Sequence, residues 1–222
     1  MILTTAERLF AERGIAAVPL RDIGAEAGQR NNVAVQYHFG DREQLLREIT
    51  TYRAAASEAG RQEMLADLVS EGRQATIADL VKAFVRPLAG HLRAGNHYLA
   101  FLSRYISERG GYAGLEGAVP TAAVTTLTAL LPRLLPGIPQ ALLDERWTIL
   151  LTSTVHTLAR YQVLMAAGRL PAPIDDLISD LEVLLTGAIE APPVPSAIAR
   201  AVPRSARRSA RRSVRSSENQ PA

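Results

Sequence analysis

Apolar residues recur at three- and four-residue intervals along most of the first 190 positions, which is the periodicity of amphipathic helices. In the first fifty residues these stretches are short and are broken by Gly14, Gly28 and Gly40. Further on, the pattern predicts six longer helices at about residues 41–68, 76–93, 96–108, 120–131, 139–167 and 174–191. Because no stretch alternates apolar and polar residues over the length of a strand, we predict an all-α fold.

The first fifty residues predict three short helices followed by the start of a long one. Gly14 is expected to end the first helix in a left-handed conformation. The second covers about residues 20–27, with Gly24 where a neighbouring helix can approach closely, and Gly28 breaks it. The third covers residues 31–37. Asp41 is expected to cap the fourth helix, with Gln44 at the reciprocal capping position.

Two short helices joined by a glycine turn form the unit that places its second helix in the major groove of DNA. Arginine can form hydrogen bonds with guanine, asparagine and glutamine can form them with adenine, and valine can contact the thymine methyl group. Nearby hydroxyl, imidazole and guanidinium groups suit phosphates. Val35 is an alternative to Val33 for a thymine methyl, and Tyr37 is alternatively packed inward. The predicted DNA-contacting residues are Arg30, Asn31, Asn32, Val33, Gln36, Tyr37, His38 and Arg42.

Three motifs in this order resemble the TetR/AcrR family of regulators: LFAERG at residues 9–14, LRDIGAEAG at 20–28 and YHFGDREQLL at 37–46. The resemblance covers about residues 1 to 50. It implies a homodimer that binds a near-palindromic operator in double-stranded DNA, usually as a repressor, and that is released when a small-molecule effector enters the larger domain. Position 29 departs from the family pattern, with glutamine where a small apolar residue is common.

The longer helices contain large side chains with polar tips among apolar neighbours, the mixture expected of a ligand cavity. Pro87 should kink the helix at residues 76–93 and open space for a ligand, or else simply end that helix. Each candidate is alternatively an ordinary core or surface residue. The predicted ligand-binding residues are His91, Tyr98, Phe101, Tyr105, Trp147, His156 and Arg160.

The last two predicted helices carry broad apolar faces, over residues 146–167 and 174–189. Paired with their symmetry mates, they would form a four-helix interface and a closed two-fold dimer. The alternative is that these faces pack only within one chain.

The net charge of +3 is concentrated at the C-terminus. Residues 191–222 contain seven arginines and one acid, a net of +6, so the preceding 190 residues carry a net of −3. This segment has scarcely any large apolar side chain, which predicts disorder or non-specific phosphate binding. We therefore expect three regions: a helix-turn-helix domain at 1–47, an all-helical ligand-binding and dimerisation domain at 48–191, and a disordered Arg/Ser/Pro-rich tail at 192–222.

Other classes of protein are less well supported. The sequence shows no apolar run of membrane-spanning length and no secretory signal at its start, so we expect no membrane partner and a cytoplasmic location. It has no cysteine, and its four histidines show no metal-binding spacing; we expect no metal, no cofactor and no enzymatic activity. A helical protein-binding module is the main alternative. The second alternative is an enzyme whose active site cannot be recognised from the sequence, because its members meet only in the folded chain.

Overall fold

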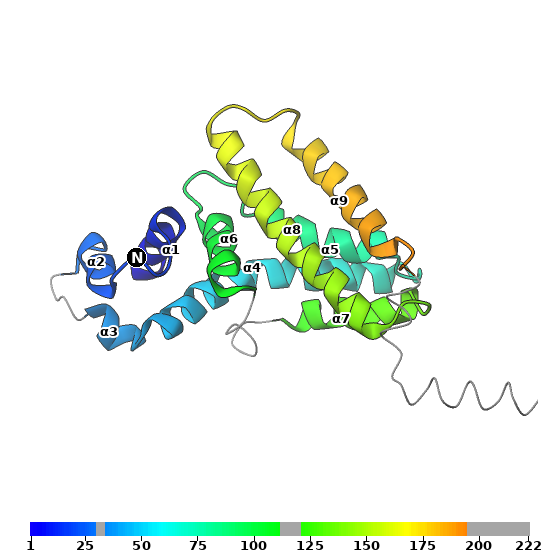
Figure 1. Cartoon of the computed structure of the whole chain (residues 1–222), viewed down its shortest axis with the longest axis horizontal. Helices are drawn as coiled ribbons and strands as arrows, with labels where there is room; N and C mark the ends of the chain where they lie inside the picture. Colours follow the sequence, from blue (N-terminus) through cyan, green and yellow to red (C-terminus); the bar gives the residue numbers. More distant parts are fainter. Residues whose placement is uncertain (30–33, 112–120, 195–222) are drawn as a thin grey trace, which may run out of the picture.

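The computed structural model describes residues 1–29, 34–111 and 121–194, and over these ranges it contains helices and no strand (Figure 1). The predicted all-α class is confirmed. The helices are α1 (Ile2–Arg13), α2 (Leu20–Glu26), α3 (Ala34–Phe39), α4 (Arg42–Ser70), α5 (Ile77–Ala89), α6 (Tyr98–Arg109), α7 (Ala122–Leu134), α8 (Gln140–Ala166) and α9 (Ile174–Glu190).

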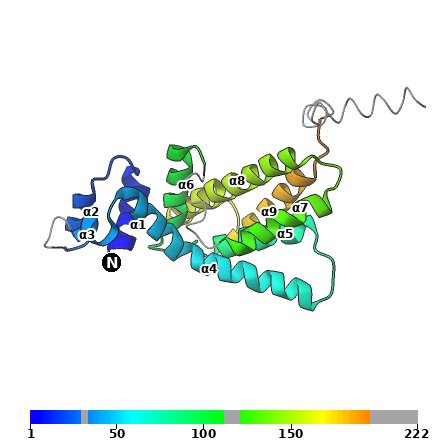
Figure 2. The ribbon, with the colours of Figure 1, turned by 90° about the horizontal axis from the view of Figure 1, so that it is seen from below.

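The helices form two groups joined by the long helix α4. At one end of the molecule α1, α2 and α3 pack together with the first turns of α4, and we call this group the N-terminal bundle (Figure 1). The rest of α4 continues along the larger group, the body, where it packs on α5 and α7 (Figure 2). Helix α6 lies between the two groups and packs on both α1 and α8.

One cluster of buried apolar side chains runs through both groups, as the helical periodicity requires. Phe10, Ile23 and Leu45 fill the N-terminal bundle, and Leu80, Leu99 and Leu127 are among those that fill the body. Each such side chain contributes roughly 1.5–3 kcal/mol when it is withdrawn from water. The two groups therefore share a continuous core.

The helix ends agree with the sequence in part. Asp41 caps α4 by accepting a hydrogen bond from the Gln44 N–H at 2.7 Å, but the Gln44 side chain donates to Glu48 instead of reaching back. The predicted reciprocal cap is therefore wrong in its second half. Gly14 ends α1 as predicted, with a φ of 90°, but its ψ of 151° is far from the left-handed helical value, so the predicted conformation is wrong.

Pro87 does not end its helix, because α5 continues to Ala89. Its ring lies against Gly60 of α4, where an added Cβ would come within 3.2 Å of the proline Cβ. The two helices thus approach closely at this point. Whether Pro87 opens space for a ligand elsewhere along α5 stays a prediction.

Among the described residues, no helix combines the length and the apolar character needed to cross a bilayer, and no cluster of acidic and histidine side chains is arranged to hold a metal ion. The predicted tail begins at residue 192, and all of it beyond residue 194 lies outside the described ranges.

Candidate nucleic-acid interface

Glycine chemistry sets the turn that precedes the predicted recognition helix. Gly28 has a φ of 72°, its N–H donates to the Ala25 carbonyl at 3.0 Å, and the Gln29 N–H donates to the Gly24 carbonyl at 2.9 Å. This pair of hydrogen bonds is the Schellman motif that ends many helices at a left-handed glycine. The prediction that Gly28 breaks the second helix is confirmed.

Close packing of α2 against α3 orients the recognition helix. A Cβ added to Gly24 would lie 3.4 Å from the Val35 side chain, so the small residue allows the contact that we expected there. Val35 itself is buried, with 1% of its surface exposed. The alternative in which Val35 touches a thymine methyl is therefore wrong, because its side chain belongs to the core.

Burial of Val35 turns the next three residues outward. Gln36, Tyr37 and His38 are all exposed, and 84% of the Tyr37 side chain is accessible, which excludes the inward packing considered for it. The Tyr37 and His38 rings meet edge to face with centroids 5.4 Å apart. These three residues make up the exposed part of α3 next to the buried Val35. Arg30, Asn31, Asn32 and Val33, the other predicted base contacts, lie outside the described residues.

Arg42 is held in a different contact from the one predicted. One guanidinium nitrogen donates to the backbone carbonyl of Ile15, which ties the start of α4 to the loop between α1 and α2. The side chain is half-buried. A phosphate contact by the remaining N–H groups stays a prediction.

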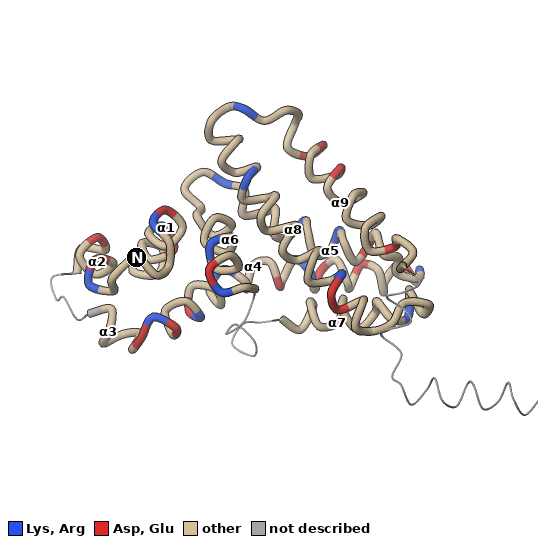
Figure 3. The backbone as a smooth tube through the Cα atoms, in the orientation of Figure 1, with Lys and Arg blue, Asp and Glu red and all other residues tan. Residues whose placement is uncertain are grey.

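The side chains of the N-terminal bundle carry no net positive charge. Its first fifty residues contain six arginines and seven acids, and Figure 3 shows both signs interspersed over α1, α2 and the start of α4. Arg8 pairs with Glu26 at 2.7 Å and with Glu12 at 3.2 Å. Arg21 lies 3.4 Å from Asp22. Much of the cationic charge on this surface is therefore compensated within the bundle.

Two acids that sequence reasoning missed attach the bundle to α6. Glu108, in the last turn of α6, accepts hydrogen bonds from the N–H groups of Ile15 and Ala16 at 3.1 and 3.2 Å. Glu7 is 1% exposed on α1; it pairs with Arg53 of α4 at 2.5 Å and accepts from the His97 N–H at 3.1 Å. The signal for Glu7 was its place between Leu3 and Phe10 on the apolar face of the first helix.

The seven predicted ligand-binding residues are distributed over three places. His91, Tyr98, Phe101 and Tyr105 form a buried series of ring contacts with centroids 4.8 to 6.4 Å apart. Trp147 is also buried but packs edge to face on Phe84. His156 and Arg160 lie on the exposed side of α8. Ligand binding by these residues stays a prediction, and they do not all line one cavity.

Burial changes the pKa values of His91 and Tyr98. His91 is 6% exposed; its Nε2 lies 3.0 Å from the Ser57 hydroxyl and its Nδ1 lies 3.3 Å from the Asn96 amide. Desolvation, together with the positive charges of Arg53 and other arginines, lowers the pKa of His91 to about 4. The imidazole is therefore neutral at physiological pH. Desolvation also raises the pKa of Tyr98 above its usual value.

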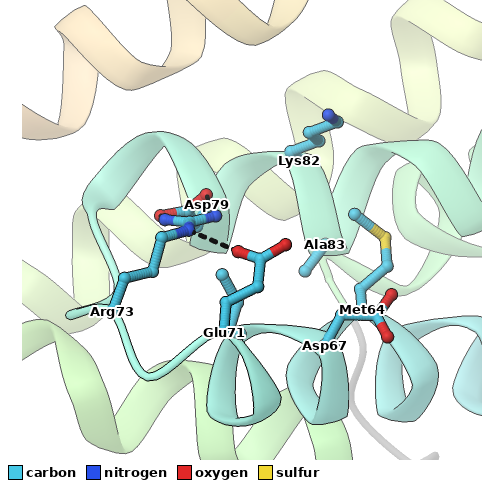
Figure 4. A pocket seen from close by; sticks show the side chains of 8 residues that line it. Met64, Asp67, Glu71, Arg73, Asp79, Lys82 and Ala83 are labelled. Carbon is cyan, nitrogen blue, oxygen red and sulfur yellow. Dashed lines mark hydrogen bonds and ion pairs between the residues drawn. The ribbon is translucent and has the colours of Figure 1, made fainter.

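A surface pocket of about 150 Å³ lies elsewhere, between the end of α4 and the start of α5 (Figure 4). Arg73 pairs with both oxygens of Asp79, at 2.7 and 2.8 Å, and with Glu71 at 2.7 Å. The contact with Arg73, together with hydrogen bonds from Thr76, holds the pKa of Asp79 well below its ordinary value. The pocket shares no residue with the predicted ligand site. It is lined by Met64, Asp67, Leu68, Glu71, Arg73, Asp79, Lys82 and Ala83.

Comparison with known families supports the sequence motifs. Residues 2–49 match the family model of bacterial regulatory proteins of the tetR family. The match begins with α1 and ends within α4, so it coincides with the N-terminal bundle. No curated protein sequence matches the chain.

Proposed function

Because this chain is a DNA-binding transcriptional regulator of the tetR family with an N-terminal helix-turn-helix domain, we propose that it is a homodimeric repressor. It binds a near-palindromic operator in the cytoplasm and leaves it when a small molecule enters the body. The proposed domains are residues 1–47 for DNA binding and 48–191 for ligand binding and dimerisation. Neither an enzymatic activity nor a cofactor is part of the proposal.

The exposed face of α3 is the observation that carries this function. Gln36, Tyr37 and His38 are all exposed, while Val35 before them is packed against Gly24. Glutamine can pair with an adenine edge, and tyrosine and histidine can donate to phosphates. A short helix that packs its inner side on α2 and α4 can present its outer side to a groove of DNA. Arg30, Asn31, Asn32 and Val33 are proposed as further base contacts from their residue types alone.

Exposed apolar side chains on the last two helices support the dimer. Ile149 and Val163 of α8 are 49% and 66% exposed, and Val183 and Leu184 of α9 are 72% and 66% exposed. Other apolar residues predicted for the interface, such as Leu150 and Leu185, are instead buried within the chain. Two-fold pairing of the exposed residues would withdraw them from water and fix the spacing of two α3 helices on DNA.

Helix α6 supplies a physical route for release. The start of α6 is held to α1 by the hydrogen bond from the His97 N–H to Glu7. Its last turn is held to the loop between α1 and α2 by the hydrogen bond from the Ile15 N–H to Glu108. On its other side α6 packs on α8, and Gln162 of α8 donates to the Asn96 carbonyl at 2.6 Å just before α6 begins. A ligand that shifts α6 relative to α8 would therefore shift the N-terminal bundle, and with it α3.

The proposal is tested by titrating duplex DNA from upstream of the chain's own gene against a shuffled duplex of equal length. We expect the wild-type chain to prefer its own upstream duplex, and Gln36→Ala with Tyr37→Ala to lose that preference. Gln140→Ala, an exposed glutamine at the far end of α8, is the matched control and should bind normally. A dimer that binds both duplexes equally would favour the protein-binding module.

A further inference from the structure

One peptide group in the loop between α1 and α2 lies between a carboxylate of α6 and a guanidinium of α4. Its N–H, which belongs to Ala16, donates to the Glu108 Oε2 at 3.2 Å. Its carbonyl, which belongs to Ile15, accepts a hydrogen bond from the Arg42 guanidinium. The Ile15 N–H also donates to both Glu108 oxygens, at 3.1 Å each. Glu108 and Arg42 are therefore connected through a single peptide group, although they belong to different helices.

The charges at the ends of this connection strengthen its hydrogen bonds. A carboxylate that accepts from an amide N–H polarises the peptide group, so the carbonyl of that group becomes a stronger acceptor. A hydrogen bond to an ionised partner is also roughly twice as strong as one between neutral groups. The negative charge of Glu108 thus favours the contact of Arg42 with the Ile15 carbonyl.

The loop is shaped to accommodate the Glu108 carboxylate. Gly14 is buried, and a Cβ added to it would lie 2.9 Å from the Glu108 Oε1, so a side chain at this position would displace the carboxylate. The Ile15 side chain is 1% exposed and belongs to the shared core. The peptide group is therefore held by apolar packing as well as by Glu108.

The next residues along the same helices form a second link. Arg109 of α6 pairs with Glu43 of α4 at 2.5 Å. The Arg109 guanidinium also lies 5.8 Å from the centroid of the Tyr105 ring. An acid followed by a base at the end of α6 thus meets a base followed by an acid at the start of α4. The first turn of α4, which carries Arg42, is consequently held against α6 by complementary charges.

Arg42 is among the residues predicted to contact a DNA phosphate. A guanidinium presents its N–H donors in a rigid planar fork, so one that is held by a carbonyl directs its remaining donors along fixed lines. We propose that Glu108 is a positioning residue for DNA binding, which acts through the peptide group between Ile15 and Ala16 to orient Arg42 toward a phosphate. The inference rests on the proposed function.

The proposal reverses the effect that is usual for an acid near DNA. A carboxylate close to the DNA surface repels phosphates, so its removal should ordinarily tighten binding. A carboxylate that positions an arginine should weaken binding when it is removed, because the arginine side chain must then be ordered when it binds. The sign of the change in DNA affinity therefore separates positioning from plain charge repulsion.

The test compares the full-length wild type with Glu108→Ala, Glu108→Gln, Arg42→Ala and the double variant Glu108→Ala, Arg42→Ala. Affinity is measured by fluorescence anisotropy over a series of KCl concentrations, on the upstream duplex and on an unrelated duplex of equal length. Glu12→Ala removes an exposed acid of α1 outside this connection and is the matched control. Circular dichroism checks that each chain is folded at the assay temperature. If Glu108→Ala is not folded, the same criteria apply to Glu108→Gln.

Arg42→Ala should weaken binding to both duplexes and flatten the plot of log affinity against log salt by about 0.9 for each phosphate released. Glu108→Ala should weaken binding by about ten-fold and flatten the same plot, whereas Glu108→Gln, which keeps one acceptor oxygen, should bind with intermediate affinity. Glu12→Ala should bind at least as tightly as the wild type. In the Arg42→Ala background, Glu108→Ala should cause no further weakening.

DNA binding by Glu108→Ala that equals or exceeds that of the wild type would overturn the proposal. Equal weakening by Glu108→Ala in the presence and absence of Arg42 would also overturn it, because the role of Glu108 would then be structural only. A wild-type chain that shows the Glu108 effect but no preference for its upstream duplex would refute the proposed function and leave this inference standing. A chain that binds neither duplex at low salt would refute both.

Discussion

The carboxylate of Glu108 accepts hydrogen bonds from the N–H of Ile15, at 3.1 Å from each oxygen, although the two residues are 93 positions apart. It joins the end of α6 to the loop that leads into α2. The body and the N-terminal bundle are therefore linked by polar contacts as well as by the shared core.

Removing this carboxylate should loosen the loop without unfolding the bundle. We expect Glu108→Ala to cost about 1 kcal/mol of stability, since the contact is partly exposed and charge-assisted. Amide exchange at Ile15 and Ala16 should accelerate, as measured by NMR. Glu145→Ala on the exposed side of α8 is the control. Unchanged exchange at both amides would show that Glu108 does not hold the loop.

Glu7 should be far more costly to replace than a surface acid. Its side chain is 2% exposed and that of Arg53 is 19% exposed, so Glu7→Ala leaves a largely buried guanidinium unpaired. We expect a loss of about 3–5 kcal/mol in the free energy of unfolding. Chemical denaturation of Glu12→Ala provides the comparison, because its pair with Arg8 is exposed and worth less than about 1 kcal/mol. Similar losses for the two variants would argue against the buried pair.

His91 should make stability dependent on pH. Its pKa is lowered from 6.5 to about 4 in the folded chain, so the unfolded chain binds the proton more readily. The free energy of unfolding should therefore fall as the pH drops from about 6.5 to about 4, by at most about 1.4 kcal/mol per pH unit from this group. Denaturation of His91→Gln over the same range should show a smaller slope. Parallel curves for the two chains would contradict the assignment.

The exposed apolar residues of α8 and α9 should control assembly. A charge in a two-fold interface meets its own copy, so Leu184→Asp should convert the dimer to a monomer. Sedimentation velocity measures the change directly. Val69, which is 81% exposed near the end of α4, offers a matched control, and Val69→Asp should leave the dimer intact. A Leu184→Asp chain that still sediments as a dimer would place the interface elsewhere.

Most of the fold could be predicted from local sequence patterns. The helical periodicity located the long helices to within a few residues, and Gly24 and Gly28 acted as expected because glycine chemistry is local. The side of α3 that faces the core was harder to predict. Its six residues are too few for the apolar periodicity to show that Val35 faces inward. The Gln44 side chain found a nearer partner in Glu48, a choice that depends on rotamers.

The links between the two groups could not be predicted in the same way. Glu108 meets Ile15, and Glu7 meets both Arg53 and His97, only because folding brings distant segments together. The candidate ligand residues show the same limit. Residue type identified aromatic side chains with polar tips, but burial of His91 and exposure of His156 depend on which side of each helix the neighbouring helices cover.

Selection of bound oligonucleotides from a random duplex pool at low ionic strength tests the central claim most directly. Because α3 is expected to read base pairs twice in a symmetric dimer, the wild-type chain should enrich a near-palindromic sequence whose half-sites lie about one helical turn, or a multiple of it, apart. The Gln36→Ala, Tyr37→Ala chain should enrich none. A wild-type chain that recovers an unenriched pool, or no DNA at all, would contradict the account.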